Sequence, residues 1–468
     1  MRWLLAAAPL LALLVTGTPS SAGQSITNWP SYLFDSGHSS YNAQATAVTP
    51  ASASGLVLAW NFRVPDPTMP GQPGGHFFAS PTVYDGAVYI GADTGVFYKL
   101  SETTGAVEAE QFLGFAPAET CDRIGIVATA TVAVDPVLGR TVVYIGGGDG
   151  NLYALDGSDL SVIWSSPANV QTPGVNDYYN WASPLVVGGR VYQGISSQCD
   201  HPLVRGGLKA FDQHTGTLVA VYHSVPSGAV GASIWSTAAA SPDGKLIFVT
   251  TGNADPQGSD RGDSYSIVAL DAATLAKRDI WTISTIVKPV DLDFGGSPTV
   301  FSGLVKGKLT PLIGAVNKNG QYYVWRMNNL RRGPVWKRRL GTGHDLAASA
   351  WDGNHLFAAS TNTTIDQVPY NGSIRELDPS TGKPLWETGL PGLVFGSPTV
   401  DGAGVVGVAT YDLSGAPNAA YLIDVSDGAI LATVSTKNSP AFSQVVFADG
   451  FVLVAVVKHH LYALRPGP

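Results

Sequence analysis

The chain has 468 residues, of which 45% are apolar and only 13% are charged, and it contains 54 glycines and 31 prolines. This composition suits short, tightly turned strands that are buried on both faces, and it argues against long helices. The formal net charge is −8 at pH 7, and the main concentration of basic residues is the stretch with Arg331-Arg332 and Lys337-Arg338-Arg339, which argues against a nucleic-acid-binding surface.

The first element in chain order is a predicted leader. Residues 1–22 begin with Arg2, continue as the apolar run LLAAAPLLALLV and end in the small residues Ser20-Ser21-Ala22, a pattern that predicts a signal peptide cleaved after Ala22. The apolar run is too short for a membrane anchor, and no cysteine follows it that could carry a lipid. We therefore expect a secreted or periplasmic protein with no membrane span.

A recurring phrase predicts the fold: a Leu-Asp pair, a short turn that often contains Thr-Gly, and then a Trp. In the cleanest copy, ELDPSTGKPLW, Leu377-Asp378 ends one strand, Ser380-Thr381-Gly382 turns the chain and Trp386 starts the next strand. A spacing of roughly 46 to 59 residues between copies is typical of four-stranded blades around one axis. The degenerate copies are KLSETTGAVEA from Lys99, ALDGSDLSVIW ending at Trp164, AFDQHTGTLVA from Ala210, ALDAATLAKRDIW ending at Trp281, VWRMNNLRRGPVW ending at Trp336 and LIDVSDGAILA from Leu422.

The two ends of the chain predict how the ring closes. The last segment, Phe442 to Pro466, ends without an outer strand, whereas GLVLAWNFRV, Gly55 to Val64, reads as an outer strand with no blade before it. Joining the two removes an open sheet edge. With seven internal blades, this predicts an all-β, eight-bladed β-propeller closed by an N-terminal outer strand. The expected division is a signal peptide at 1–22, an N-terminal extension at 23–54 and the propeller at 55–468.

The chain has two cysteines, Cys121 and Cys199. An even number in an exported chain favours one disulfide over two buried free thiols. No C-x-x-C-H motif is present, so no haem of the c type is covalently attached to this chain.

The segment from Trp29 to Val64 contains a Trp, an Asp, an Asn and a Leu-x-x-x-Trp strand, in that order. In this it resembles the opening of the pyrroloquinoline quinone (PQQ)-dependent alcohol dehydrogenases, and the repeats resemble the same family, in particular polyvinyl alcohol dehydrogenase-like members. Because blade strands run outward from the axis, polar residues at the ends of inner strands should converge on one mouth of the channel. The family's site residues are expected there.

The segment SIWSTAAASPDGKLIFVTTGN, Ser233 to Asn253, carries the most specific part of the resemblance. It implies that Trp235 is the aromatic floor under the quinone, that Ser233 contacts the cofactor and that Asn253 ligates a metal ion. A flat tricyclic quinone needs a broad aromatic face, and a hard cation needs oxygen ligands. The alternative is that Trp235 fills the core and Asn253 belongs to a turn.

In VDLDFGGSP, Val290 to Pro298, Asp293 falls where the family has its catalytic Asp. The resemblance implies that Asp293 takes the alcohol proton and also binds the metal. Lanthanide-dependent members carry an extra Asp two residues later, where this chain has Gly295, so the resemblance implies Ca²⁺. In AVNKNGQYYVW, Lys318 aligns with a cation that bonds the quinone oxygens. An Asp293 that caps a turn and a Lys318 exposed in one are the alternatives.

One departure from the family concerns the metal. In GISSQCDHPLVRGG, Gly194 to Gly207, the family has a metal-ligating Glu, and this chain offers Cys199, Asp200 or His201 instead. Asp200 is the hard anionic ligand among these three.

Two further departures concern the cofactor. Phe78 in HFFASPTV replaces a cofactor-contacting Glu of the family. The family's disulfide between adjacent cysteines over the quinone is also missing, and a Cys121–Cys199 bridge could lie in the same region. The resemblance further implies that Arg123 contacts a cofactor carboxylate.

The leading hypothesis is an exported dehydrogenase that uses PQQ and Ca²⁺ to oxidise an alcohol, which could be a polyol, a polymer or a metabolite hydroxyl. Its electrons would pass to a separate acceptor such as a cytochrome c. The alternative is a non-catalytic propeller that acts as an extracellular binding or assembly module, which Phe78 and the missing Glu favour. The retained Trp235, Asn253, Asp293 and Lys318 favour the enzyme.

Overall fold

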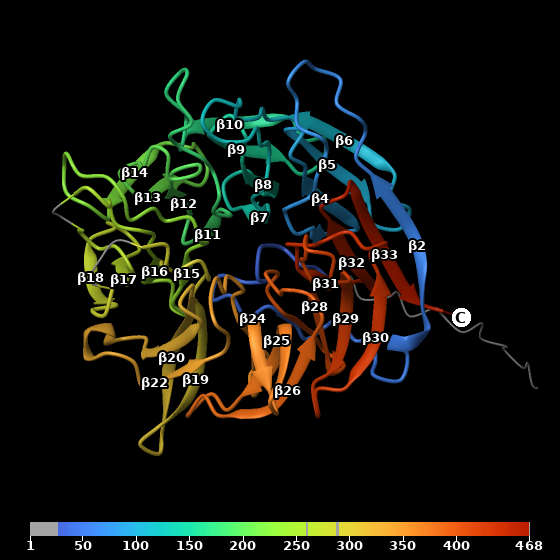
Figure 1. Cartoon of the computed structure of the whole chain (residues 1–468). Helices are drawn as coiled ribbons and strands as arrows, with labels where there is room; N and C mark the ends of the chain where they lie inside the picture. Colours follow the sequence, from blue (N-terminus) through green and yellow to red (C-terminus); the bar gives the residue numbers. More distant parts are fainter. Residues whose placement is uncertain (1–26, 259–260, 287–289, 468) are drawn as a thin grey trace, which may run out of the picture.

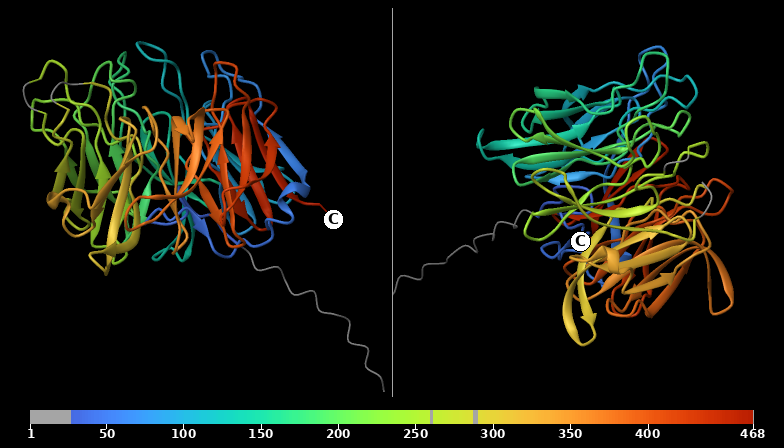
Figure 2. Two further views of the ribbon diagram at one scale, coloured as in Figure 1. Left: turned by 60° about the horizontal axis from the view of Figure 1, so that its bottom comes forward. Right: turned by 90° about the vertical axis from the view of Figure 1, so that its left-hand side faces the viewer.

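A computed structural model describes residues 27–258, 261–286 and 290–467, so the predicted signal peptide lies outside the described residues. The described chain forms eight sheets, arranged as blades around a central axis (Figure 1). Views from two other directions show the sheets standing beside one another around the ring (Figure 2). The prediction of an all-β, eight-bladed propeller is confirmed. Among the described residues, no helix has the length and apolar character needed to cross a bilayer.

Blades 1 to 4 each consist of four consecutive antiparallel strands, from the innermost to the outermost. Their bounds are β3 (Thr82–Tyr84), β4 (Ala87–Gly91), β5 (Val96–Ser101) and β6 (Val107–Phe112); β7 (Thr131–Asp135), β8 (Arg140–Gly146), β9 (Asn151–Asp156) and β10 (Val162–Pro167); β11 (Leu185–Val187), β12 (Arg190–Ile195), β13 (Gly207–Asp212) and β14 (Leu218–His223); β15 (Ala239–Ala240), β16 (Leu246–Thr250), β17 (Ser266–Asp271) and β18 (Lys277–Thr282).

Blades 5 to 7 repeat this order, and two short 3₁₀ helices, η1 (Ala53–Gly55) and η2 (Leu330–Arg332), lie in loops. The strands of these blades are β19 (Thr299–Val305), β20 (Lys308–Asn317), β21 (Gln321–Arg326) and β22 (Trp336–Arg339); β23 (Ala350–Trp351), β24 (Leu356–Ile365), β25 (Val368–Leu377) and β26 (Pro384–Leu390); β27 (Thr399–Asp401), β28 (Val405–Ala409), β29 (Ala419–Asp424) and β30 (Ile430–Ser435).

Blade 8 is built from both ends of the chain. Its three inner strands are β31 (Val445–Ala448), β32 (Phe451–Val456) and β33 (His460–Pro466), and its outer strand is β2 (Leu56–Arg63). The strands β2 and β33 run antiparallel, with Leu56 opposite Pro466 and Arg63 opposite His460. The predicted closure by an N-terminal outer strand is therefore confirmed.

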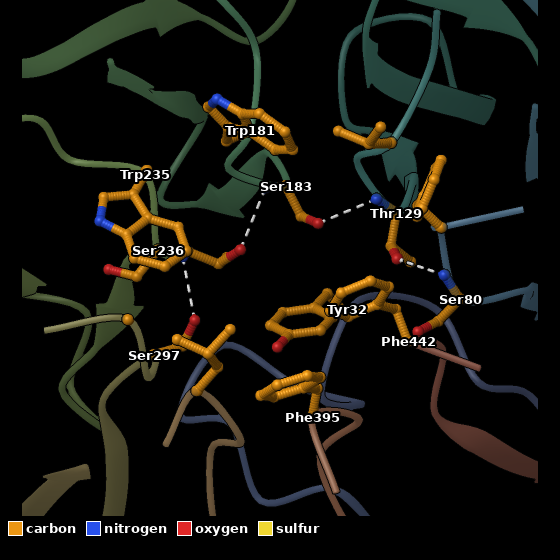
Figure 3. Close-up of a pocket in the computed structure, with 15 residues that line it drawn as sticks. Tyr32, Ser80, Thr129, Trp181, Ser183, Trp235, Ser236, Ser297, Phe395 and Phe442 are labelled. Carbon is orange, nitrogen blue, oxygen red and sulfur yellow. Dashed lines mark hydrogen bonds between the residues drawn. The ribbon is translucent and has the colours of Figure 1, made fainter. Parts of the chain in front are cut away.

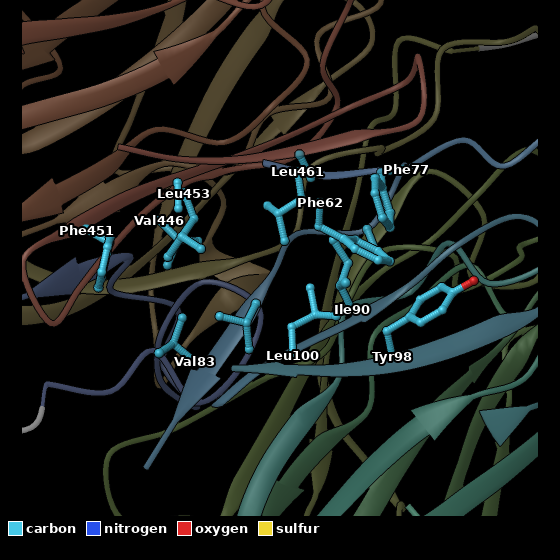
Figure 4. Close-up of a cluster of buried hydrophobic side chains, with 14 of the residues drawn as sticks. Phe62, Phe77, Val83, Ile90, Tyr98, Leu100, Val446, Phe451, Leu453 and Leu461 are labelled. Atoms are coloured by element: carbon cyan, nitrogen blue, oxygen red, sulfur yellow. The ribbon is translucent and has the colours of Figure 1, made fainter. Parts of the chain in front are cut away.

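The seam between blades 8 and 1 is filled with apolar side chains. Phe62 from β2 and Leu461 from β33 belong to the same buried cluster as Ile90 and Leu100 from blade 1 (Figure 4). Burying this apolar surface stabilises the closed ring at about 25 cal/mol per Å².

The repeated phrase has a structural explanation, because the Trp of one blade docks on the turn of the next. Trp386 in β26 donates its indole N–H to the carbonyl oxygen of Val425 at 2.9 Å, and its ring covers Gly428. Gly428 has φ +76°, and a Cβ on it would lie 2.5 Å from the ring, so glycine is required there. The same arrangement joins Trp60 to Glu102 and Gly105, Trp164 to Gln213 and Gly216, and Trp336 to Pro379 and Gly382.

Two of the degenerate copies are adapted to their neighbours rather than randomly changed. Leu160 in blade 2 and Leu275 in blade 4 occupy the glycine position, with φ +62° and +54°. The preceding outer strands carry Ala109 and Ala220 where blades 2, 5, 6 and 8 carry Trp, and each Leu belongs to the apolar cluster against which that Ala packs. A large residue on the turn is thus matched by a small one on the strand, which keeps the interface filled.

The N-terminal segment, residues 27–42, runs around the inside of the ring (Figure 1, blue). Trp29 exchanges two backbone hydrogen bonds with Val83 in β3, and β1 (Tyr41–Asn42) pairs in parallel with β27. In between, carbonyl oxygens of this segment accept hydrogen bonds from innermost strands of other blades. These bonds are Val132 N to Pro30 O, Ala240 N to Ser36 O, Val300 N to Gly37 O, Trp351 N to Ser39 O and Val400 N to Ser40 O. The segment therefore ties six blades together from within.

A second set of bonds joins neighbouring blades just before their inner strands, through the hydroxyls of serine or threonine at equivalent repeat positions. A backbone N–H of one blade donates to the hydroxyl of the next at 2.9–3.0 Å. The consecutive members are Ser80, Thr129, Ser183, Thr237 and Ser297, and Gln444 N donates back to Ser80 Oγ. We call this set the hydroxyl ring.

Candidate active site

A cavity of about 430 Å³ lies where blades 3, 4 and 5 meet the mouth of the channel. Its residues either precede the innermost strand of a blade or follow the second strand, which are the ends that converge there. Seven of the residues predicted from the sequence gather in it. The lining consists of Trp181, Ser197, Gln198, Cys199, Asp200, His201, Ser233, Trp235, Gly252, Asn253, Asp291, Asp293 and Lys318.

Lys318 is the centre of the charged part of this cavity. Its Nζ lies 2.6 Å from Asp291 Oδ1 and 2.7 Å from Asp293 Oδ1. The same Nζ lies 5.0 Å from the centroid of the Trp235 ring, and Trp235 Nε1 donates to Asp293 Oδ2 at 2.8 Å. The alternative of a solvent-exposed turn lysine is wrong, since 14% of the Lys318 side chain is exposed. No role was predicted for Asp291, although it stands two residues before Asp293 in the same loop.

The two carboxylates around Lys318 differ in their environment. Burial raises the pKa of Asp293, because the opposing effects of the Lys318 charge and of the hydrogen bonds from Lys318 and Trp235 do not fully compensate. Burial also acts on Asp291, but hydrogen bonds from Lys318 and Asn253 outweigh it and lower the pKa of Asp291. Burial alone would lower the pKa of Lys318, and Asp293 and Asp291 together raise it instead. Asp293 is thus the better proton acceptor of the two carboxylates.

Asn253 and Asp200 complete the polar wall. Asn253 Nδ2 donates to Asp291 Oδ1 at 3.1 Å and to Asp200 Oδ2 at 3.3 Å, and Asn253 Oδ1 is buried without a hydrogen-bond partner among the described residues. The hydroxyl of Ser197 donates to Asp200 Oδ1, and Ser233 Oγ accepts the backbone N–H of Ser197 at 3.1 Å. Ser233 therefore contributes to the site mainly by fixing the position of the loop that carries Asp200.

The donor chemistry of this wall fits a hard cation. Three carboxylates and one lysine leave an excess of negative charge in the cavity, and Asn253 Oδ1 is an unpaired neutral oxygen. Within the described part of the chain, however, no three His, Cys, Asp or Glu side chains are arranged to hold a metal by themselves. Asp200, Asn253 and Asp293 would hold a calcium ion only together with oxygens from a cofactor or water.

Gly295 has a packing reason to be a glycine. A Cβ at this position would lie 2.4 Å from Leu346 Cδ2 and 2.8 Å from Trp235 Cη2. A side chain at this position would therefore collide with Leu346 and Trp235 unless both moved.

The two cysteines are linked, with their Cα atoms 6.2 Å apart. Cys199 lines the cavity, so the bridge fastens the loop between β6 and β7 to the rim of the site. Asn176 Oδ1 accepts the backbone N–H of Cys121 at 3.2 Å and fixes the same loop. Arg123 is exposed and packs near Gly71, outside the residues that line the cavity, so its contact with a cofactor carboxylate stays a prediction.

A second cavity, which we call the axial chamber, lies on the propeller axis and shares Trp181 and Trp235 with the first (Figure 3). Phe78, the residue that replaces a family Glu, lines this chamber and not the charged cavity. Its ring is 5.9 Å from that of Phe442. Phe78, which stands in place of the family Glu, thus belongs to an aromatic wall that faces Trp181 and Trp235 across the axis.

An eight-bladed propeller that gathers an aromatic ring, a lysine between carboxylates and an amide oxygen at one mouth has the organisation of a quinoprotein. The chain belongs to the family described as glucose/ethanol/alcohol dehydrogenase, β-propeller domain, which it matches over residues 29–336. Residues 311–466 also match the outer membrane protein assembly factor BamB.

Individual relatives are distant. The chain is 26% identical to quinohemoprotein alcohol dehydrogenase ADH IIB of Pseudomonas putida over 208 residues, which is 38% of this chain and 28% of the relative. Among solved structures, quinohemoprotein alcohol dehydrogenase ADHIIG of Pseudomonas putida HK5 matches with TM-score 0.75 and 17% identity, over 94% of this chain and 80% of that one. A europium-containing methanol dehydrogenase matches with TM-score 0.72 and 16% identity, over 94% and 98%. At these identities the structures establish the shared fold.

Proposed function

We propose that the protein is a PQQ- and Ca²⁺-dependent dehydrogenase that oxidises an alcohol. The observation that carries the proposal is Lys318, held between Asp291 and Asp293 and lying 5.0 Å from the centroid of the Trp235 ring. Membership of the alcohol dehydrogenase propeller family supports it.

In this proposal each residue has a defined task. Trp235 offers the flat face on which the cofactor rests, and Lys318 hydrogen-bonds the cofactor oxygens on which negative charge develops. Asp200, Asn253 and Asp293 bind the calcium ion. Asp293 accepts the proton of the alcohol hydroxyl. When bound, PQQ supplies a two-electron acceptor and calcium a Lewis acid.

The proposal extends to the surroundings of the reaction. The predicted signal peptide supports a secreted or periplasmic location, and the substrate is a polyol, a polymer or a metabolite hydroxyl. Since the sequence has no C-x-x-C-H motif, we propose that the electrons pass to a separate acceptor such as a cytochrome c.

The test is dye-linked alcohol oxidation by the purified chain with added PQQ and CaCl₂. We expect PQQ to bind at micromolar concentration only when calcium is present, and an alcohol to reduce the dye. Asp293→Asn keeps an acceptor for the Trp235 indole but removes the base, so the rate should fall by about 10²- to 10⁴-fold. Asp427→Asn, in an exposed turn of blade 7, is the matched control and should keep the rate.

A second candidate function is a non-catalytic binding or assembly module, which the match of residues 311–466 to BamB favours. Its distinguishing outcome is a natively folded chain that binds neither PQQ nor calcium at micromolar concentration. That result would overturn the dehydrogenase proposal.

A further inference from the structure

The axial chamber is a built cavity of about 200 Å³ with its own chemistry. One residue from each blade forms its rim. This residue lies two positions before the hydroxyl ring member of the blade, or before the equivalent residue where the blade has no hydroxyl. In blade order these are Phe78, Val127, Trp181, Trp235, Gly295, Leu346, Phe395 and Phe442. We call them the rim residues.

One side of the rim is a continuous aromatic wall. Phe395 and Phe442, from blades 7 and 8, stack with centroids 5.5 Å apart and an interplanar angle of 17°, and Phe78 from blade 1 follows at 5.9 Å from Phe442. Tyr411 supports the wall, with its ring centroid 4.2 Å from that of Phe442. Trp181 and Trp235 face this wall across the chamber (Figure 3).

Below the rim, the hydroxyl ring presents hydrogen-bond donors. Ser80, Thr129 and Ser183 line the chamber, and each hydroxyl oxygen already accepts a backbone N–H from a neighbouring blade. Within the described part of the chain, none of the three hydroxyls donates its own hydrogen to a protein acceptor. A hydroxyl whose oxygen is occupied in this way is left with a donor to offer. Tyr32 from the N-terminal segment also lines the chamber, with its hydroxyl 3.3 Å from Ser397 Oγ.

The chamber carries no charge, in contrast to the cavity around Lys318. Among the described residues that line it, none is Asp, Glu, Lys, Arg or His. Transferring an ionised group into such a site would cost free energy without a compensating partner. The chamber is therefore suited to a neutral ligand and not to a carboxylate-bearing cofactor.

We propose that the axial chamber binds a neutral molecule with an aromatic or compact apolar body and an oxygen that accepts hydrogen bonds from the hydroxyl ring. Because the chamber shares Trp181 and Trp235 with the candidate active site, this ligand is the apolar body of the alcohol substrate. The assignment to the substrate rests on the proposed function, whereas binding to the chamber does not. It favours an apolar or aromatic alcohol over a polyol.

The first test measures binding to the full chain without PQQ, by titration with benzyl alcohol, and with sorbitol for comparison. The readout is the change in total tryptophan fluorescence, to which Trp181 and Trp235 in the chamber wall contribute. Val127→Phe adds an aromatic ring to the rim, as at Phe78, and should fill the chamber and weaken benzyl alcohol binding at least tenfold. Val137→Phe is the matched control, since Val137 is 68% exposed, and should leave binding unchanged.

Phe442→Leu provides a second variant that keeps an apolar side chain. Removing one aromatic contact should weaken benzyl alcohol binding by about 2- to 12-fold, from a stacking contribution of about 0.5–1.5 kcal/mol. Thermal melting checks that each variant folds. The inference is overturned if sorbitol binds as tightly as benzyl alcohol, or if neither rim variant changes the affinity.

Activity then separates this inference from the proposed function. Benzyl alcohol that binds the chamber while PQQ supports no dye reduction would remove the proposed function and leave the chamber as a ligand site. Dye reduction with a KM for benzyl alcohol that Val127→Phe does not raise would keep the dehydrogenase and reject the chamber as its substrate site.

Discussion

Replacing Lys318 with methionine should destabilise the protein far more than neutralising its partner Asp293. Only 3% of the Asp293 side chain is exposed, and Lys318 is the cation in contact with it. Removing one partner of a buried ion pair leaves an uncompensated charge and costs about 3–5 kcal/mol. Asp293→Asn leaves Lys318 with Asp291, whose side chain is 57% exposed, and keeps the acceptor for Trp235, so we expect a cost of about 1 kcal/mol.

The double variant distinguishes an ion pair from two independent contributions. If Lys318→Met is destabilising because it leaves the Asp293 charge buried without a partner, adding Asp293→Asn should recover about 2 kcal/mol of the lost stability. The free energies come from equilibrium urea unfolding followed by far-UV circular dichroism, with all variants free of PQQ. Strictly additive effects, or a Lys318→Met variant no less stable than Asp293→Asn, would refute a buried ion pair between Lys318 and Asp293.

The same pair predicts a pH dependence. The pKa of Asp293 is raised in the folded protein and should rise further in Lys318→Met, because the lowering effect of the ammonium is lost. A carboxyl group whose folded pKa is above its unfolded value of about 3.9 favours the folded state at low pH, and this contribution is lost as pH rises through the folded pKa. The stability deficit of Lys318→Met should therefore shrink as the pH is lowered from 7 toward the unfolded pKa. A deficit that grows on acidification would contradict the assignment.

Three further predictions concern the scaffold. Gly216→Leu alone should destabilise the protein by about 2–4 kcal/mol, because φ is +69° and a Cβ would lie 2.6 Å from the Trp164 ring. Adding Trp164→Ala should recover part of this cost, because it recreates the Leu–Ala pair of other blades. The urea midpoints of the two single variants and of the double variant test this prediction. Replacing Cys121 and Cys199 together with serine opens a 78-residue loop and should cost up to about 4 kcal/mol, matched by the effect of dithiothreitol on the parent protein; equal midpoints with and without reductant would contradict it. Trp29→Ala, at a side chain with 0% exposure, should cost about 3–5 kcal/mol in the same assay, and a value below 1 kcal/mol would show that the N-terminal segment is dispensable for the ring.

The sequence predicted the blades because their signal is local and repeated. Turn residues recur in every copy and a Trp follows the turn in several of them, and the unmatched outer strand around Trp60 indicated the closure. The reason why the copies differ was not predicted. The large Leu160 side chain is accommodated because the preceding blade has the small Ala109 against it. Comparing each turn with the outer strand one blade earlier would have found this.

The candidate site could be predicted in part. Asp200, Asn253, Asp293 and Lys318, which the resemblance singled out, line one cavity. The resemblance implied no role for Asp291, because its contact with Lys318 depends on the path of the loop before β19. The path of the N-terminal segment was equally hidden from the sequence. Its bonds to the innermost strands use backbone carbonyls, which every residue possesses, so no side-chain pattern marks them.

The pairing of β2 with β33 sets an order of events during synthesis. Leu56 leaves the ribosome long before Pro466, and at about 5–20 residues per second the delay over some 400 residues is roughly 20–80 s. Until then β2 has no partner along its sheet edge, and its Val57 and Leu58 face solvent even in the finished ring. The first blade strand to be synthesised is thus the last to gain its partner, and the nascent chain must be kept from pairing with other copies until its own C-terminus arrives.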